Sequence, residues 1–282
     1  MRYSLYYTRK CTGRRAAKHI WRRAWFIFCT VTLLTLIAGK VNAEEFITAR
    51  YKDPVNRYGH FALGKPHEYA AVAATTQSGR ILHFRLPREL VFEDLEPRII
   101  SLAAGDKTQL LTIVSGRDGG ARLMLLKREG DRLVPSAQSA PIGTPMRWLN
   151  PVGAADLDGD GQTEIAAVIT PHIGGILKVF RKVGNHLVEI AALGDFSNHV
   201  FSSEILGLSA VTQIKGRMIL VVPDSKRKRL RLVALANRQL IEVGSCALER
   251  PLKNALKLHR HGSIEISGSL QPRLINLENC GL

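Results

Sequence analysis

The sequence predicts an all-β protein, and three observations support this prediction. After Ala43, no apolar helical period is sustained over the length of a helix. Short runs rich in Val, Ile and Leu instead recur between clusters of Gly, Asp, Asn and Pro, which is the pattern of strands joined by turns. The composition of the 282 residues, 45% hydrophobic and 23% charged, is that of a globular protein and excludes a collagen, a wholly disordered chain and a multispanning membrane protein.

The first 43 residues have the layout of a secretory signal peptide. They carry nine of the 40 Lys and Arg residues and no acid, so most of the net charge of +16 lies in this segment. An apolar run over 24–39 follows the basic region, and Val41 and Ala43 place small side chains before the expected cleavage point. We expect a signal helix, 1–43, that is cleaved after Ala43. An uncleaved membrane anchor is the alternative, although the run is shorter than the ~20 residues of a spanning helix.

Export places the mature chain, 44–282, in the periplasm or outside the cell. Cys246 and Cys280 are the two cysteines that follow the leader. In an oxidising compartment they can form a disulfide that joins the last two structural units. The alternative is a pair of buried free thiols, and their spacing does not decide between the two.

The mature chain repeats one pattern, in which a buried strand, a loop and a second strand follow each other. Five copies start near residues 69, 110, 165, 219 and 264, about 49 residues apart on average. The expected strand pairs are 69–72 with 81–85, 110–113 with 123–127, 165–168 with 176–181, and 219–222 with 230–233. Outer strands are expected at 187–190 and 240–243, and the fifth, weaker copy begins near 263–266.

Periods of ~40 to 50 residues with several strands each are typical of propeller blades. We therefore expect one β-propeller domain of about five blades over 44–282. Six blades, a sandwich and an open array are the alternatives. Since a ring of blades has to close, we expect the segment 45–51 to add an outer strand to the last copy.

A loop at 155–164, between the second and third copies, carries acids at alternate positions, beginning with Asp156. Calcium takes six to eight oxygen ligands at ~2.3 to 2.6 Å, which a tight loop of alternate carboxylates can supply. Gly159 and Gly161 allow the backbone to turn sharply. An EF-hand does not fit, because its last ligand would fall on Ala167 and a strand follows the loop; the RTX nonapeptide is absent as well.

The segment 155–168, followed by Gly174, Gly175 and a strand over 176–180, resembles the FG-GAP/VCBS repeat. This propeller repeat occurs in integrin α-subunits and in many secreted bacterial proteins. The strong match covers about 30 residues, and the other copies share only the strand pattern. In that family the loop joins two strands of a blade and binds calcium. The resemblance implies one structural Ca²⁺ whose ligands are Asp156, Asp158, Asp160, Gln162 through its carbonyl oxygen, and Glu164.

The corresponding places in the second and fourth copies, 106–109 and 213–216, lack this set of acids, so one metal is expected. The alternative is an acidic hairpin that binds no ion tightly. Because no nucleophile or pair of general acid and base stands nearby in the sequence, we expect the ion to fix the loop and to take no part in catalysis.

A basic turn follows the first strand of the fourth copy, and we expect it to cap a hairpin with its side chains reaching outward. A solvated turn is one interpretation; a patch for an anionic envelope surface is the other. Nucleic acid is not an expected partner, because the chain is exported and aromatic residues are not interleaved there. The residues of this turn are Lys226, Arg227, Lys228 and Arg229.

The leading functional hypothesis is an exported, monomeric, non-catalytic module that binds a protein or glycan partner. The sequence holds no common hydrolase, metalloprotease, phosphate-loop or dinucleotide motif, which favours a protein that is not an enzyme. One alternative is a hydrolase or lyase with an axial active site. Another is a structural envelope component held by an uncleaved leader. Candidate residues for an axial site are His60, His67, His172 and His199.

Overall fold

The computed structural model describes residues 45–259, 262–267 and 272–281, and the expected signal peptide lies outside these ranges. The described residues form strands, turns and one short 3₁₀ helix, η1 (Leu277–Cys280). The prediction of an all-β fold is therefore confirmed. Among the helices of the described ranges, none is long and apolar enough to cross a membrane.

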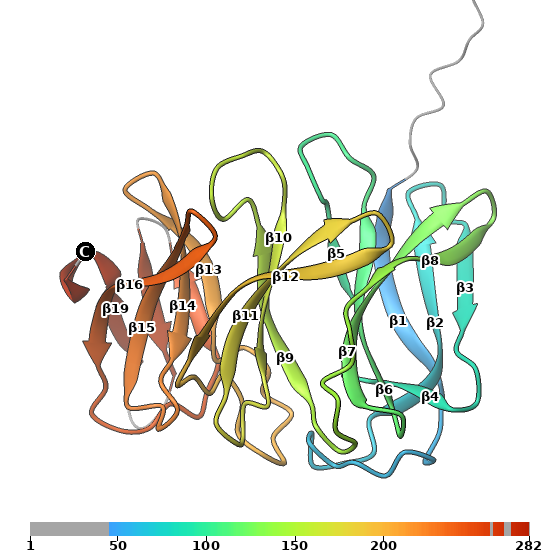
Figure 1. The fold of residues 1–282 in the computed structure, drawn as a ribbon, viewed down its shortest axis with the longest axis horizontal. Helices are drawn as coiled ribbons and strands as arrows, with labels where there is room; N and C mark the ends of the chain where they lie inside the picture. Colours follow the sequence, from blue (N-terminus) through green and yellow to red (C-terminus); the bar gives the residue numbers. More distant parts are fainter. Residues whose placement is uncertain (1–44, 260–261, 268–271, 282) are drawn as a thin grey trace, which may run out of the picture. The chain divides into compact units, whose positions relative to one another are not determined.

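The strands follow each other in five groups (Figure 1). The first group is β1 (Phe46–Pro54), β2 (Glu68–Thr76) and β3 (Ile81–Arg85). The second is β4 (Leu90–Glu93), β5 (Arg98–Ile100), β6 (Gln109–Gly116), β7 (Gly120–Glu129) and β8 (Arg132–Gln138). The third is β9 (Leu149–Ala155), β10 (Glu164–Ile169), β11 (Ile176–Val183) and β12 (His186–Gly194). The fourth is β13 (Ala210–Ile214), β14 (Arg217–Pro223), β15 (Arg229–Ala236) and β16 (Gln239–Ala247). The fifth is β17 (Leu256–His259), β18 (Ser263–Ile266) and β19 (Arg273–Asn276).

Four of the groups are antiparallel meanders, whereas in the second group β4 and β5 both pair with β6. The third and fourth groups have four strands paired in chain order. This arrangement is that of propeller blades. The expected strands at 81–85 and 263–266 coincide with β3 and β18, and the others lie inside longer strands. Two local pairings join the first three groups into one curled sheet: β4 pairs with both β2 and β6, and His186 of β12 pairs with Gln138 of β8.

Four apolar cores lie between successive groups, because each central strand is buried on both faces. In β10, Ile165 and Ala167 contribute to the core shared with the second group, whereas Ala166 and Val168 contribute to the core shared with the fourth group. The alternation follows from the two-residue period of a strand. The sheets are thus packed face to face, and the apolar side chains of β10 are buried against the sheets on both sides.

The expected closure of a ring by the segment 45–51 is wrong. This segment is β1, and it pairs with β2 in the first group, with Tyr51 opposite Val72. The Tyr51 ring stacks on Tyr69 and Phe92 at centroid distances of 5.5 and 5.0 Å, so its apolar side chain is already buried in the first core. Within the described ranges, no strand pairing joins the first group to the fifth, and the two lie at opposite ends of the series in Figure 1.

A disulfide joins Cys246 of β16 to Cys280 of η1, with the two Cα atoms 4.9 Å apart. It fixes the end of the chain to the fourth sheet, as the first of the two sequence-based alternatives proposed. The backbones approach closely at this point: a Cβ on Gly244 would lie 2.6 Å from the carbonyl oxygen of Cys280. Glycine is therefore required there by space.

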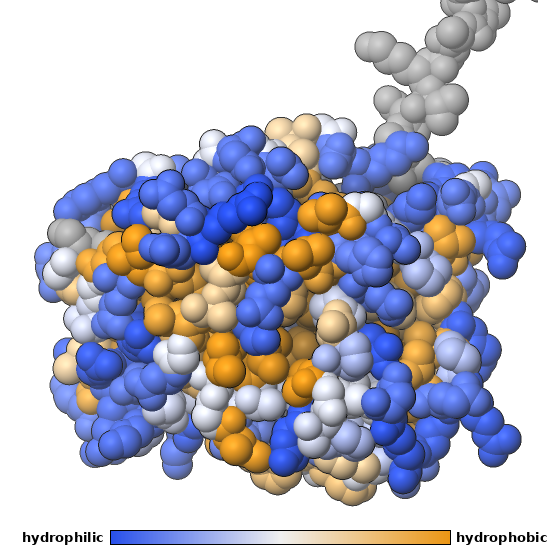
Figure 2. All heavy atoms as spheres, viewed as in Figure 1, coloured by the Kyte–Doolittle hydropathy of each residue, from blue (hydrophilic) through white to orange (hydrophobic). Residues whose placement is uncertain are grey.

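The face that carries β12 and β16 mixes apolar and hydrophilic side chains (Figure 2). Val188 of β12 and Ile241 of β16 are among its exposed apolar residues. Both belong to the last strand of a four-stranded sheet, which packs against other strands on fewer sides than the central strands do. Exposed apolar residues that are scattered in this way are normal for a soluble surface.

Candidate functional site

The acidic turn, 156–163, joins β9 to β10 at the upper end of the third sheet in Figure 1. The Asp156 carboxylate closes the turn, because its Oδ1 accepts from the Gly159 amide at 2.8 Å and its Oδ2 from the Gly161 amide at 2.9 Å. Both glycines have positive φ, 81° and 88°, as expected from the sequence. Short-range hydrogen bonds thus hold the turn in a shape that points its acids toward one side.

Glu164, the first residue of β10, is fully buried beneath this turn. Its Oε2 accepts from the Leu157 amide at 2.8 Å, and its Oε1 accepts from Nη2 and Nε of Arg181 at 2.6 and 2.9 Å. Burial raises the pKa of Glu164, and the hydrogen bonds from Leu157 and Arg181 act in the opposite direction. A buried carboxylate is retained in proteins when it is paired and hydrogen-bonded in this way.

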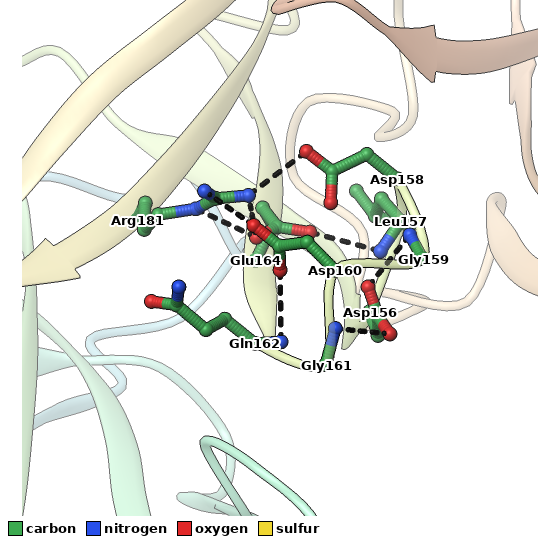
Figure 3. A network of polar contacts seen from close by, with 9 residues as sticks. All are labelled: Asp156, Leu157, Asp158, Gly159, Asp160, Gly161, Gln162, Glu164 and Arg181. Carbon is green, nitrogen blue, oxygen red and sulfur yellow. Dashed lines mark hydrogen bonds and ion pairs between the residues drawn. The ribbon is translucent and has the colours of Figure 1, made fainter.

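One guanidinium, that of Arg181 in β11, lies among the acids of the turn (Figure 3). Besides Glu164, its Nη2 lies 2.9 Å from Asp158 Oδ2 and its Nη1 lies 2.8 Å from Asp160 Oδ2. Arg181 stands directly opposite Glu164 in the β10–β11 ladder, so the hairpin register places it there. The analysis of the sequence missed this residue.

The structure brings together three of the four carboxylates among the five predicted metal ligands. One oxygen each of Asp156, Asp158 and Glu164 lie within 4.8 Å of one another. The fourth, Asp160, turns to Arg181 and accepts from the Gln162 amide at 2.9 Å. The side chain of Gln162 extends away from Asp156 and Asp158 in Figure 3.

The residues of the turn fit a hard divalent cation. Their donors are carboxylate oxygens, which calcium prefers, and the three that converge are close enough to share one ion. The three aspartates of the turn and Glu164 outnumber the single guanidinium, so the cluster keeps an excess of negative charge. Arg181 is nevertheless a cation already in contact with three of these acids, and a metal would have to share them with it.

At the opposite end of the third sheet, two of the four histidines singled out in the sequence meet. His172 Nε2, in the β10–β11 turn, lies 2.7 Å from His199 Nδ1, in the segment between β12 and β13. His199 Nε2 lies 2.8 Å from the Ser203 carbonyl oxygen and has to donate to it. His199 Nδ1 therefore carries no proton and accepts a hydrogen bond. The donor is the Nε2–H group of His172.

Both imidazoles are neutral at physiological pH. Burial lowers the pKa of His172 to about 3, helped by the repulsion that His199 would exert if both rings were protonated, and burial lowers the pKa of His199 to about 4. The indole of Trp148 lies parallel to the His172 ring with centroids 6.2 Å apart, and 4.9 Å from the His199 ring. An apolar neighbourhood disfavours the charged form of a histidine.

A third histidine belongs to the same end of the molecule. His60 Nδ1 lies 2.7 Å from Oε1 of Glu93 in an ion-pair contact, although the two atoms are not aligned as a hydrogen bond. Ser115 Oγ donates to the other oxygen of Glu93 at 2.6 Å, and burial raises the pKa of this carboxyl. The fourth histidine, His67, pairs instead with Glu204 at 3.0 Å.

The basic turn caps the β14–β15 hairpin as expected, but its side chains do not all reach outward. Asp224 Oδ1 accepts from the Lys228 amide at 2.7 Å and from the Arg229 amide at 3.1 Å, which fixes the turn. Arg227 points inward, where its Nη1 donates to Ser197 Oγ at 2.8 Å. The outward reach expected for Arg227 is therefore wrong, because a buried hydroxyl attracts its guanidinium.

Two segments that are far apart in the chain meet at the same end. The amide of Ser202, before β13, donates to the carbonyl oxygen of Ala62, between β1 and β2, at 2.9 Å. A Cβ on Gly64 would lie 2.5 Å from the Ser202 carbonyl oxygen, so the segments touch closely. Phe61 and Phe201, one from each segment, are 44% and 55% exposed. Each of the two touching segments therefore carries one partly exposed phenylalanine, and the Phe201 ring also meets the His172 ring edge-on with centroids 5.3 Å apart.

No family model and no curated protein matches the chain. Solved structures are similar to it at low sequence identity. The structure of the Dos1 propeller is 11% identical with a TM-score of 0.46, and the match covers 74% of this chain and 51% of that chain. A candidate 6-phosphogluconolactonase from Bacteroides fragilis is 14% identical with a TM-score of 0.39, and the match covers 75% and 62% of the two chains. The chain thus spans about half of the first structure and less than two thirds of the second.

Proposed function

We propose that the chain is an exported, monomeric module of five propeller-type blades in an open array, which binds a protein or glycan partner and is not an enzyme. One observation carries this proposal, the contact between 61–64 and 201–204 that presents Phe61 and Phe201 to solvent. Aromatic side chains supply much of the binding free energy of protein interfaces. Their rings also stack on apolar faces of ligands.

Export is supported by the disulfide between Cys246 and Cys280, because such bonds persist in oxidising compartments. We propose that 1–43 is a cleaved signal peptide and that the mature chain is periplasmic or secreted. An anionic envelope surface is a further partner through the exposed Lys226 and Lys228, and nucleic acid is not one. Cell fractionation tests the anchored alternative, since an uncleaved leader would place the full-length chain in the membrane fraction.

We propose that the acidic turn is an FG-GAP/VCBS-type site for one structural Ca²⁺. Asp156, Asp158 and Glu164 would hold it, and the ion would supply the positive charge that the excess of carboxylates lacks. Thermal unfolding with calcium and with a chelator tests this claim. At a calcium concentration of about 100 times Kd, binding adds about 2.7 kcal/mol to the free energy of unfolding. We expect Asp158→Ala to abolish the difference; equal transitions of the wild type in both solutions would contradict the site.

The binding role is tested by immobilising the mature chain, 44–282, and presenting envelope extract and a panel of glycans. We expect Phe61→Ala with Phe201→Ala to lower retention of the captured partner at least about tenfold, since truncating an aromatic residue that anchors an interface costs about 1 kcal/mol or more. The matched control is Val183→Ala with Ile241→Ala, which removes two apolar side chains exposed elsewhere. Equal loss in both double variants, or retention in both, would contradict this surface.

A hydrolase or lyase is the second candidate function, and one observation favours it. The buried Glu93 lies 2.7 Å from His60 Nδ1, and a small rotation into a hydrogen bond would let this carboxylate orient the imidazole as a general base. Turnover of hydrolase and lyase substrates that is lost in His60→Gln and kept in His67→Gln would establish this function. Absence of turnover on such a panel leaves the binding module as the function.

A further inference from the structure

A surface cavity of about 680 Å³ lies at the end of the first two sheets, outside the sites described above. Three stretches of chain line it: the start of the β1–β2 segment, the β3–β4 connection and the β6–β7 turn. Its size is within the range of small-molecule sites, roughly 300 to 1,000 Å³. One part of the wall is apolar, formed by Pro87, Leu90 and Val91 together with Tyr58.

Each of the three stretches contributes one arginine to the wall: Arg57, Arg88 and Arg117. In the part of the chain that the structure describes, none of the three forms a salt bridge. Two acids also line the cavity, but Asp118 is held by Arg122 through hydrogen bonds of 2.8 and 2.6 Å. The second acid is the exposed Glu89, so the three arginines outnumber the one carboxylate of the wall that Arg122 does not hold, and the cavity has a net positive charge.

Hydrogen bonds hold one of these arginines in place before any ligand binds. Arg57 Nη2 donates to the Leu90 carbonyl oxygen at 2.7 Å and to that of Pro87 at 3.4 Å. Arg57 Nε is buried and has no hydrogen-bond partner. Arg117 Nη2 lies 3.5 Å from the Arg57 carbonyl oxygen, at the limit of a hydrogen bond, and the Arg88 side chain is exposed. The exposed guanidinium groups of Arg88 and Arg117 are thus held less firmly than that of Arg57.

We propose that this cavity binds an acidic saccharide through its oxyanion group. Arginine presents a planar fork of donors that matches the oxygens of a carboxylate, sulfate or phosphate group. The accessible apolar part of the wall, the exposed Pro87 and the half-buried Leu90, suits the face of a sugar ring beside that group. The inference rests on the proposed binding role and specifies the chemical class of its glycan ligand.

Isothermal titration of the mature chain, 44–282, tests the proposal with four probes: tetragalacturonate, a chondroitin sulfate disaccharide, glucose 6-phosphate and the neutral cellotetraose. Inorganic phosphate is titrated as well, to separate a sugar phosphate from a free ion. The variant is Arg88→Gln with Arg117→Gln. The control is Arg132→Gln with Arg217→Gln, two exposed arginines that do not line the cavity and that give the same change in net charge. Thermal unfolding of each variant shows whether it is folded.

We expect at least one acidic saccharide to bind the wild type, and its Kd to rise about tenfold or more in the cavity variant but not in the control. The acidic saccharide that binds most tightly identifies the oxyanion. Three outcomes would overturn the proposal: no acidic saccharide binds up to about 5 mM, free phosphate binds as tightly as the acidic saccharides, or the control loses binding as the cavity variant does. Binding of cellotetraose that depends on Phe61 and Phe201 would overturn the acidic class and leave the proposed binding module intact.

Discussion

The two ends of β10 satisfy buried polar side chains by opposite means. At the first end, the carboxyl group of Glu164 is paired, because Arg181 stands opposite it in the ladder and the Leu157 amide donates to it. At the other end, His172 and His199 are kept neutral by burial beside Trp148. The same strand thus separates a site that requires charge from one that excludes it.

The difference comes from what each neighbourhood offers. The acidic turn offers a guanidinium, so ionisation of its acids is compensated at short range. No acid contributes to the pKa values of the two histidines; Arg227 instead lowers both. A buried imidazole without a carboxylate beside it loses its charge. Removing the guanidinium should therefore destabilise the first end only, and a fall in pH that protonates histidines should act on the other end only.

The largest expected effect comes from removing the cation of the first end. Arg181→Leu leaves the Glu164 carboxylate buried without its partner, and breaking a buried ion pair in this way costs about 3 kcal/mol or more. Urea denaturation followed by circular dichroism measures the loss in the free energy of unfolding.

The matched control is Lys178→Leu, on the same strand, whose partner Glu189 is 43% exposed. A pair that is open to solvent is worth about 0 to 1 kcal/mol, so this variant should stay close to the wild type. Equal stabilities of the two variants would show that Arg181 is not required to compensate Glu164.

The second expected effect is a pH dependence that arises at the other end. In the folded state the pKa values of His172 and His199 are lowered to about 3 and about 4. In the unfolded chain both histidines have the ordinary pKa of about 6.5, so they take up protons below that pH. Above pH 6.5 both states are neutral and stability is complete. As the pH falls from 6.5 toward these folded-state values, the unfolded state binds more protons, and stability decreases by about 1.4 kcal/mol per pH unit for each histidine.

Denaturation between pH 7.5 and 5 measures this slope. We expect His172→Gln with His199→Gln to flatten it, whatever the double variant does to stability at neutral pH. The control is His186→Gln, an exposed histidine on β12. A wild-type slope that persists in the double variant would show that other groups carry the pH dependence.

Most of the fold was predictable because its strands are buried on both faces and so read as short apolar runs. The strands 81–85 and 263–266 were located to the residue. The role of 45–51 was not predictable, because the pattern of β1 suits an edge of any sheet, and only the stacking of Tyr51 on Tyr69 and Phe92 assigns it to the first one. Pairing between distant strands is a tertiary choice that the local pattern does not specify.

Some residues of the sites could likewise be predicted from a local pattern in the sequence, and others could not. The acids of the turn could be found because alternate carboxylates are a local pattern. Arg181 could have been found from the hairpin, since a turn at 170–175 places residue 181 opposite 164. The contact of His172 with His199 could not, because it depends on the segment between β12 and β13 returning to the β10–β11 turn.

The smallest expected effect distinguishes the acids of the turn from one another. Asp160 is 38% exposed, and its contacts are Arg181 Nη1 and the Gln162 amide. Asp160→Asn keeps an acceptor for that amide and removes a charge that solvent already screens, so we expect a loss below about 1 kcal/mol. Urea denaturation beside Glu164→Gln, in which the changed group is fully buried, makes the comparison. A larger loss in Asp160→Asn than in Glu164→Gln would mean that the exposed rim of the turn, and not its buried base, holds Arg181 in place.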